Sequence, residues 1–138
     1  MTHVNDATVI RNLLTSPGRW AVVGLSKNKA RAAWNVSALL QQLGHTIVPV
    51  HPSADEVHGQ RGYPSLGAIG APIDVVDVFV HSQAAGDIVD QAIAIGAKAV
   101  WLQLDVIDED AAARAKAAGL DVVMDTCPSI ERRSLGLF

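Results

Sequence analysis

A short basic segment follows an apolar run near the start of the chain, in the sequence WAVVGLSKNKARAAW of residues 20–34. The apolar run is typical of a buried strand, and Gly24 stands where such a strand would turn into a helix. The first N–H groups of a helix and the positive end of its dipole attract an anion. This turn therefore predicts a phosphate site, to which Ser26 could add a hydroxyl.

Three basic side chains surround the predicted turn: Lys27, Lys29 and Arg31. They favour a ligand with several phosphates, because an ammonium group supplies a point charge and a guanidinium group supplies a forked donor. Cations are disfavoured at a helix N-terminus, so their cost there would be offset by a bound anion. The alternative is that the three side chains are simply exposed to water at the start of a helix and bind no ligand.

The turn departs from the three-glycine fingerprint of dinucleotide sites, since Ser26 and Lys29 occupy the second and third glycine positions. Enzymes that use NAD also have an acidic residue near the end of the second strand. The corresponding sequence here is IVPVHPS, residues 47–53, and the first carboxylate after it is Asp55. The sequence therefore disfavours NAD and allows NADP or coenzyme A.

Transitions from helix to strand recur along the chain and predict its fold. Gly44, Gly96 and Gly119 each end an amphipathic run, and a short apolar run follows within two residues. Repeated units of this kind form parallel sheets. We expect an α/β protein with a Rossmann-like, doubly wound sheet of five mostly parallel strands and helices on both faces. The expected strands lie near residues 20–24, 46–50, 74–80, 97–103 and 121–124.

Apolar stripes predict the helices between these strands. An initial helix is expected over about residues 6–14, and a short helix is expected in PSLGAI, within the long loop of residues 51–72. Asp105 is expected to cap the helix that contains DEDAAARAKAAG. The stripes expected to face the sheet are Ala33, Val36, Leu40 and Leu43 in one helix and Ala84, Ile88, Ala92 and Ile95 in another.

Composition limits the class of protein. With 138 residues, of which 49% are apolar, the chain 1–138 is expected to form a single domain. A net charge of -3 without a basic block argues against nucleic-acid binding, and the chain has no long apolar span for a membrane. One cysteine and no leader segment predict a cytoplasmic protein. The histidines show no ligand spacing, so no metal site is expected.

A ligand is expected across the carboxyl ends of the strands, where open α/β sheets hold their ligands. With the first strand central, the crevice would be bordered by the turn after it and by the ends of the other strands. The candidate binding residues on these segments, besides the three basic ones, are Gly24, Leu25, Ser26, Val50, His51, Pro52, Phe79, Val80, His81, Ser82, Gln103 and Cys127.

Other residues are candidates for chemistry or for the core. Cys127 precedes a proline at the expected start of a short helix, whose dipole would lower the thiol pKa. A nucleophile also needs a base, and His81 is its one candidate, so we expect no catalysis by Cys127. A mixed disulfide with coenzyme A is a further hypothesis. Asp77 is polar within an apolar strand and is assigned no catalytic role, and Trp34 and Trp101 are expected to be packing residues.

Five segments between Trp20 and Glu131 resemble, in order and spacing, the small single-domain bacterial coenzyme A-binding proteins, themselves similar to the N-terminal CoA-binding domain of the succinyl-CoA synthetase alpha subunit. The segments are WAVVGLSKNKARAAWNVSALLQQLGHTIVPVHP, GQRGYPSL, DVVDVFV, AIAIGAKAVWLQL and GLDVVMDTCPSIE. The resemblance implies that Gly24, Leu25, Ser26 and the three basic side chains contact phosphates. It also implies that residues 50–52 and 79–82 surround the adenosine or its linker, with Gln103 and Cys127 further along the crevice.

We therefore expect a stand-alone module that binds coenzyme A or an acyl-CoA, with a non-catalytic or regulatory role and no identified protein partner. One alternative is an NADP-dependent oxidoreductase, which would need a further domain to hold a substrate. Another is an accessory subunit of an acyl-CoA ligase or transferase. That reading would require a phosphorylatable histidine and a nucleotide-binding grasp, and neither is visible in the sequence.

Overall fold

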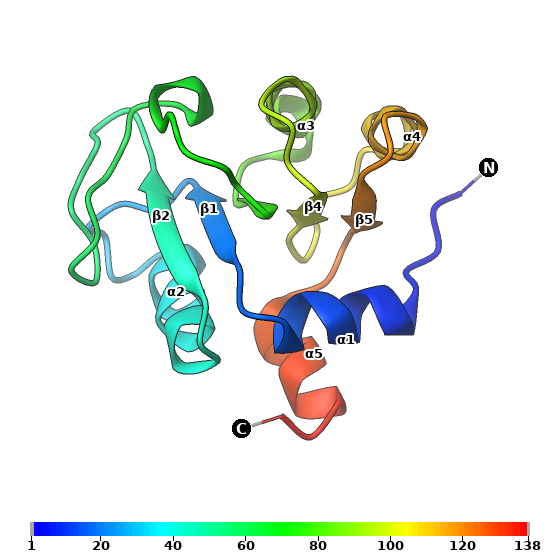
Figure 1. The fold of residues 1–138 in the computed structure, drawn as a ribbon, viewed down its shortest axis with the longest axis horizontal. Helices are drawn as coiled ribbons and strands as arrows, with labels where there is room; N and C mark the ends of the chain where they lie inside the picture. The colour runs from blue at the N-terminus through cyan, green and yellow to red at the C-terminus, as the bar shows by residue number, and fades with distance from the viewer. Residues whose placement is uncertain (1, 138) are drawn as a thin grey trace.

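The computed structural model describes residues 2–137 and contains one parallel sheet of five strands (Figure 1). The strands are β1 (Arg19–Val23), β2 (Thr46–Val50), β3 (Val75–Val78), β4 (Ala99–Leu102) and β5 (Asp121–Val123). Each predicted strand is confirmed, with ends that differ by at most two residues. The Rossmann-like α/β class is thereby confirmed.

The central strand is β3, because the strand order is β2-β1-β3-β4-β5. The expected central position of the first strand is therefore wrong, but the order of strands still reverses at its edge, between β1 and β3. Gly24 ends β1 at this point with φ +102, and a Cβ atom there would collide with the carbonyl oxygen of Phe79. A glycine is required at this position because the two strand ends approach so closely.

Helices cover both faces of the sheet, as predicted (Figure 1). One face carries α1 (Ala7–Thr15), α2 (Ala32–Gln42) and α5 (Pro128–Ser134), and the other carries α3 (Ser82–Ala94) and α4 (Glu109–Ala117). The short helix predicted in PSLGAI is the 3-10 helix η1 (Leu66–Ala68). No helix among residues 2–137 is both long and apolar enough to cross a membrane.

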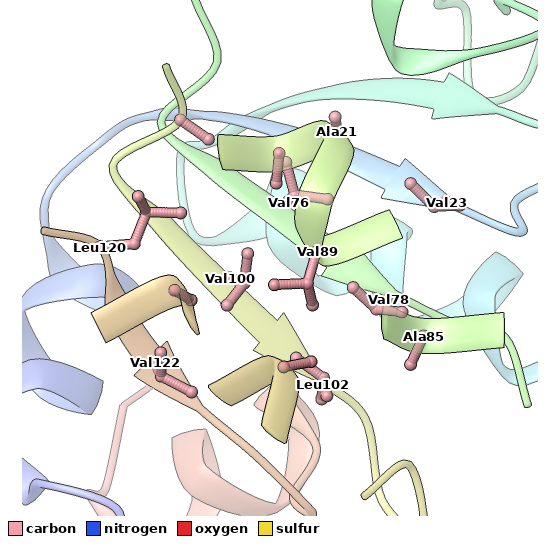
Figure 2. Close-up of a cluster of buried hydrophobic side chains, with 14 of the residues drawn as sticks. Ala21, Val23, Val76, Val78, Ala85, Val89, Val100, Leu102, Leu120 and Val122 are labelled. Carbon is pink, nitrogen blue, oxygen red and sulfur yellow. The ribbon is translucent and has the colours of Figure 1, made fainter. Parts of the chain in front are cut away.

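Two apolar clusters fill the space between the sheet and these layers. Figure 2 shows the cluster under α3 and α4, in which Val89 of α3 lies over Val76 and Val100 of the sheet. The other cluster lies under α1, α2 and α5 and contains Trp20 and Trp101, with ring centroids 5.6 Å apart. Because strand side chains alternate between faces, neighbouring residues of one strand serve the two clusters.

Both tryptophans that the sequence assigned to packing have structural contacts. Trp101 is fully buried, and its Nε1 donates a hydrogen bond of 2.9 Å to the carbonyl oxygen of Thr126. Trp34 is half-buried on α2, where its ring centroid lies 4.5 Å from that of His58. The packing role predicted for both residues is confirmed.

The cap of α4 is Asp108, whose side chain accepts a hydrogen bond of 2.9 Å from the N–H of Ala111. The prediction that Asp105 caps this helix is wrong. Asp105 lies three residues earlier with φ +68, and its own N–H is bonded to the Asp125 carboxylate at 2.8 Å. The helix α4 therefore begins at Glu109, later than the predicted cap at Asp105 implied. The segment after β4 first turns towards the loop after β5.

Candidate ligand-binding site

A cavity of about 1050 Å³ lies over the carboxyl ends of the strands. Its size is at the upper end of the range of small-molecule pockets. The structure brings most of the sequence-predicted residues into its wall. The predicted residues that line it are Gly24, Ser26, Arg31, Val50, His51, Pro52, Phe79, Val80, His81, Gln103 and Cys127.

The other four predicted residues lie outside the cavity wall. The Leu25 side chain is fully buried in the cluster around Trp20, and Lys27 is exposed. The Nζ atom of Lys29 lies 5.4 Å from the centroid of the Trp34 ring, a cation–π arrangement. The Ser82 hydroxyl joins the loop after β4 to α3, donating to the Asp105 carbonyl oxygen at 3.2 Å. Of the three basic side chains, Arg31 is therefore the one that lines the cavity.

Several N–H groups of the loop between β1 and α2 are already bonded within the protein. The N–H of Lys27 donates to the carboxylate of Asp55 at 3.0 Å, and this hydrogen bond lowers the pKa of Asp55. The N–H of Asn28 donates to the Ser26 hydroxyl at 3.2 Å. The chain's own side chains therefore occupy these two donors, which leaves the first N–H groups of α2 as the nearby candidates for an anion.

The helices whose first turns line the cavity have no side-chain cap. Arg31 precedes α2 and His81 precedes α3, and neither side chain bonds to the first N–H groups of its helix. By contrast, α1 and α4, which do not line the cavity, are capped by Asp6 and Asp108. Because uncapped N–H groups carry the positive end of the helix dipole, the starts of α2 and α3 are positions in the cavity wall that attract an anion.

An apolar wall completes the cavity on the side of α3. Ala84 and Ile88 line the cavity, whereas the buried stripe of α3 is Ala85, Val89 and Ala92. The predicted stripe is therefore wrong for the exposed Ala84, whereas Ile88 both lines the cavity and packs, partly buried, against the apolar cluster under α3. The helix carries two adjacent apolar stripes, and the second of them was the available signal for a ligand-facing surface.

Further lining residues come from segments that the strand-end rule does not reach. They belong to the first turn of α2, to η1 with the preceding Pro64 and Ser65, and to the start of α5. Leu104 and Ile130 also line the cavity while remaining 52% and 47% exposed. A strand-end rule cannot find the residues of α2, η1 and α5, because they reach the site through the path of a loop or the docking of a helix.

Cys127 lies half-buried in the cavity wall, at the start of α5. Burial raises the pKa of its thiol, although the N–H groups of Ser129 and Ile130 act in the opposite direction. The predicted lowering of this pKa is therefore wrong, since desolvation outweighs the helix N-terminus. A thiol with a raised pKa is mainly protonated at neutral pH and is a weak nucleophile.

Asp77 stands behind the cavity wall and is fully buried. It accepts a hydrogen bond at Oδ1 from Nε2 of Gln103, which lines the cavity. Burial raises the pKa of Asp77 to about 8, against the opposing effect of the Gln103 hydrogen bond. The carboxyl group is therefore mostly neutral at pH 7, which the sequence did not predict.

Comparison with known proteins agrees with the geometry of an open α/β ligand site. A family model described as a CoA binding domain matches residues 18–133. The uncharacterized protein YneT of Bacillus subtilis (strain 168) is 36% identical over 118 residues, which span 86% of this chain and 87% of YneT. The family model covers the whole segment, residues 20–131, that carried the sequence resemblance.

Solved structures share the fold. A hypothetical protein from Pyrococcus horikoshii OT3 superposes with a TM-score of 0.87 at 35% identity, over 98% of this chain and 99% of that one. The dinucleotide forming acetyl-coenzyme A synthetase 1 of Ca. Korarchaeum cryptofilum superposes with a TM-score of 0.71 at 22% identity, over 87% of this chain and 30% of that one. At that identity, the likeness to the synthetase concerns the fold alone.

Proposed function

The chain belongs to the CoA-binding domain family, and on that premise we propose that it binds coenzyme A or an acyl-CoA in the cavity over its strand ends. The observation that carries this proposal is the division of the cavity into two chemical parts. The uncapped start of α2 and the Arg31 side chain offer positive charge. Ala84, Ile88 and Phe79 offer an apolar wall.

The two parts suit a ligand that is charged at one end and largely uncharged at the other. Arg31 lies on the connection after β1, Phe79 follows β3 and Gln103 follows β4. Strands in a sheet are about 4.8 Å apart, so the ends of β1 and β4, separated by β3, lie roughly 10 Å apart. An elongated cofactor could therefore extend from the phosphate positions to the apolar wall.

We place the phosphates at the first turn of α2 rather than along the preceding loop. The Lys27 N–H in that loop is bonded to Asp55, whose carboxylate would repel a phosphate. The start of α2 combines N–H groups without a side-chain cap and the nearby Arg31 guanidinium, which suits bidentate phosphate binding.

We further propose a binding or regulatory role for this chain as a stand-alone cytoplasmic module. The raised pKa of the Cys127 thiol supports binding over covalent catalysis, because a protonated thiol attacks slowly. The comparisons give the NADP alternative no support, and the likeness to a synthetase concerns the fold alone. The accessory-subunit reading therefore has no specific observation in its favour.

Thermal denaturation in the presence of coenzyme A, acetyl-CoA, NAD, NADP and ATP tests the proposal. A ligand that binds only the folded state, at a concentration 100-fold above its Kd, stabilises that state by about 2.7 kcal/mol. We expect coenzyme A or acetyl-CoA to raise the melting temperature most. A shift with NADP and none with coenzyme A would contradict the proposal.

A further inference from the structure

A buried polar pair forms part of the cavity wall on the neighbouring strands β3 and β4. Gln103 follows β4, and its Nε2 donates a hydrogen bond to Oδ1 of Asp77 in β3. Asp77 is inaccessible to solvent and Gln103 is 4% exposed. Among the residues that line the cavity, Gln103 is the buried polar side chain.

This pair is unfavourable for the stability of the fold taken alone. Asp77 lies on the sheet face of the apolar cluster that includes Val75, two residues before it on the same strand. Its second carboxyl oxygen, Oδ2, is buried without a hydrogen-bond partner. Such an atom lowers stability, so the pair is not explained by what it contributes to the fold.

Asp77 and the main chain together hold Gln103 in one position. The Gln103 N–H donates to the carbonyl oxygen of Val78 at 3.3 Å, and its own carbonyl oxygen accepts from the N–H of Val106 at 2.9 Å. Asp77 takes up one N–H of the side-chain amide. The second N–H and the oxygen Oε1 of that amide remain for a ligand in the cavity.

The chemistry of this position fits an amide group better than a phosphate. Gln103 is uncharged and offers one donor and one acceptor, which is the complement of a secondary amide. Phe79, Val106 and Ile88 line the same cavity and suit an alkyl chain. Coenzyme A has such a segment, since the arm between its phosphates and its thiol alternates alkyl groups with two amides.

We propose that Gln103 recognises an amide of the uncharged arm of coenzyme A, and that Asp77 is a positioning residue that holds the Gln103 side chain for this contact. The inference rests on the proposed function. It assigns to the pair the recognition of the arm, while Arg31 and the start of α2 serve the phosphates.

Calorimetric titration of two ligands tests this assignment. Adenosine 3′,5′-bisphosphate keeps a phosphorylated nucleotide and lacks the arm. In Gln103→Met, which has a side chain of similar length and no amide, we expect the affinity for coenzyme A to fall about tenfold, the effect of losing one buried hydrogen bond. The affinity for the bisphosphate should stay unchanged.

Two variants of Asp77 separate positioning from a general structural effect. Asp77→Asn keeps an oxygen that can accept from Gln103, so it should retain the wild-type affinity for coenzyme A. Asp77→Val removes the acceptor, so it should lose affinity for coenzyme A and none for the bisphosphate. Equal losses for both ligands would indicate a disturbed fold and would overturn the positioning role.

A measurement on the unaltered protein guards against variants that fail to fold. In a two-dimensional amide NMR spectrum, the Gln103 side-chain signals should move on addition of coenzyme A and remain in place with the bisphosphate. Unmoved signals, or wild-type affinity of Gln103→Met for coenzyme A, would overturn the role of Gln103 alone. Failure of the unaltered protein to bind coenzyme A would instead overturn the proposed function and this inference with it.

Discussion

Asp74 and Asp77 lie near opposite ends of β3, and the fold surrounds them differently. Asp74 accepts the N–H of Arg19 at 2.8 Å and pairs with the Lys98 Nζ at 3.2 Å. The hydrogen bond from Arg19 lowers the pKa of Asp74, and Lys98 acts in the same direction. Asp77 has Gln103 as its hydrogen-bond partner, and burial raises its pKa to about 8.

The same contrast extends beyond β3. At the amino end of the sheet, the ring of His45 is bonded on both nitrogens, to the carbonyl oxygen of Leu14 at 3.0 Å and to the N–H of Gly18 at 3.2 Å. Burial lowers the pKa of His45, so the ring is neutral at pH 7. At the carboxyl end, α2 and α3 begin without side-chain caps. These polar groups at the amino end bond within the fold, whereas the first N–H groups of α2 and α3 at the carboxyl end have no side-chain cap.

The largest expected effect is the pH dependence that Asp77 produces. Its pKa is about 8 in the folded protein against 3.8 as the reference, so the folded protein binds the extra proton between these values. The free energy of unfolding should therefore fall as the pH rises from about 4 to 8, on the order of a few kcal/mol. Asp77→Asn should abolish this decline, as urea denaturation at several pH values would measure.

Other groups titrate in both the wild type and Asp77→Asn. Their contributions to the free energy of unfolding therefore cancel when the two pH profiles are compared. The lowered pKa of His45 means that stability is lost as the pH falls below 6.5, and the lowered pKa of Asp74 means a similar loss below about 3.8. The pKa of the Cys127 thiol is raised by burial and by Asp77, so this group titrates above the pH range of the comparison. Parallel stability curves for the wild type and Asp77→Asn would contradict the assignment of a raised pKa to Asp77.

The next effect concerns the amino end of the sheet. Asp74→Ala should leave the part-buried N–H of Arg19 without its partner and lower the free energy of unfolding by about 2 kcal/mol. Affinity for coenzyme A should not change. The matched control is Lys98→Ala, whose side chain is 79% exposed, with an expected loss of less than about 1 kcal/mol. A loss of ligand affinity in Asp74→Ala would break the division between the two ends.

The smallest effect compares two basic residues of the loop between β1 and α2. Arg31→Ala should weaken coenzyme A binding about tenfold, because a charge-assisted contact to phosphate would be lost. Lys29→Ala should weaken it less than about twofold, since the Lys29 Nζ lies over the Trp34 ring and its side chain does not line the cavity. Calorimetric titration would measure both affinities. Equal losses would contradict the placement of the phosphates at the start of α2.

Much of the candidate site followed from the rule that ligands lie at the carboxyl ends of parallel strands. This rule led to Gly24, Phe79 and Gln103, which line the cavity. It could not orient α3, whose rotation about its own axis turns Ala84 and Ile88 towards the cavity. Two apolar stripes on a helix look alike in a sequence, and packing against the sheet selects the one that is buried.

Local sequence patterns were sufficient to predict the five strands, the helices between them and the parallel arrangement of the strands. Apolar periodicity and helix-ending glycines act over a few residues, so they can be read from consecutive positions. The order of the strands, the capture of the Lys27 N–H by Asp55 and the burial of Asp77 required the folded chain. Hydrogen-bond partners and desolvation come from segments far apart in sequence, and they decide which N–H groups stay free and which carboxyl group is neutral.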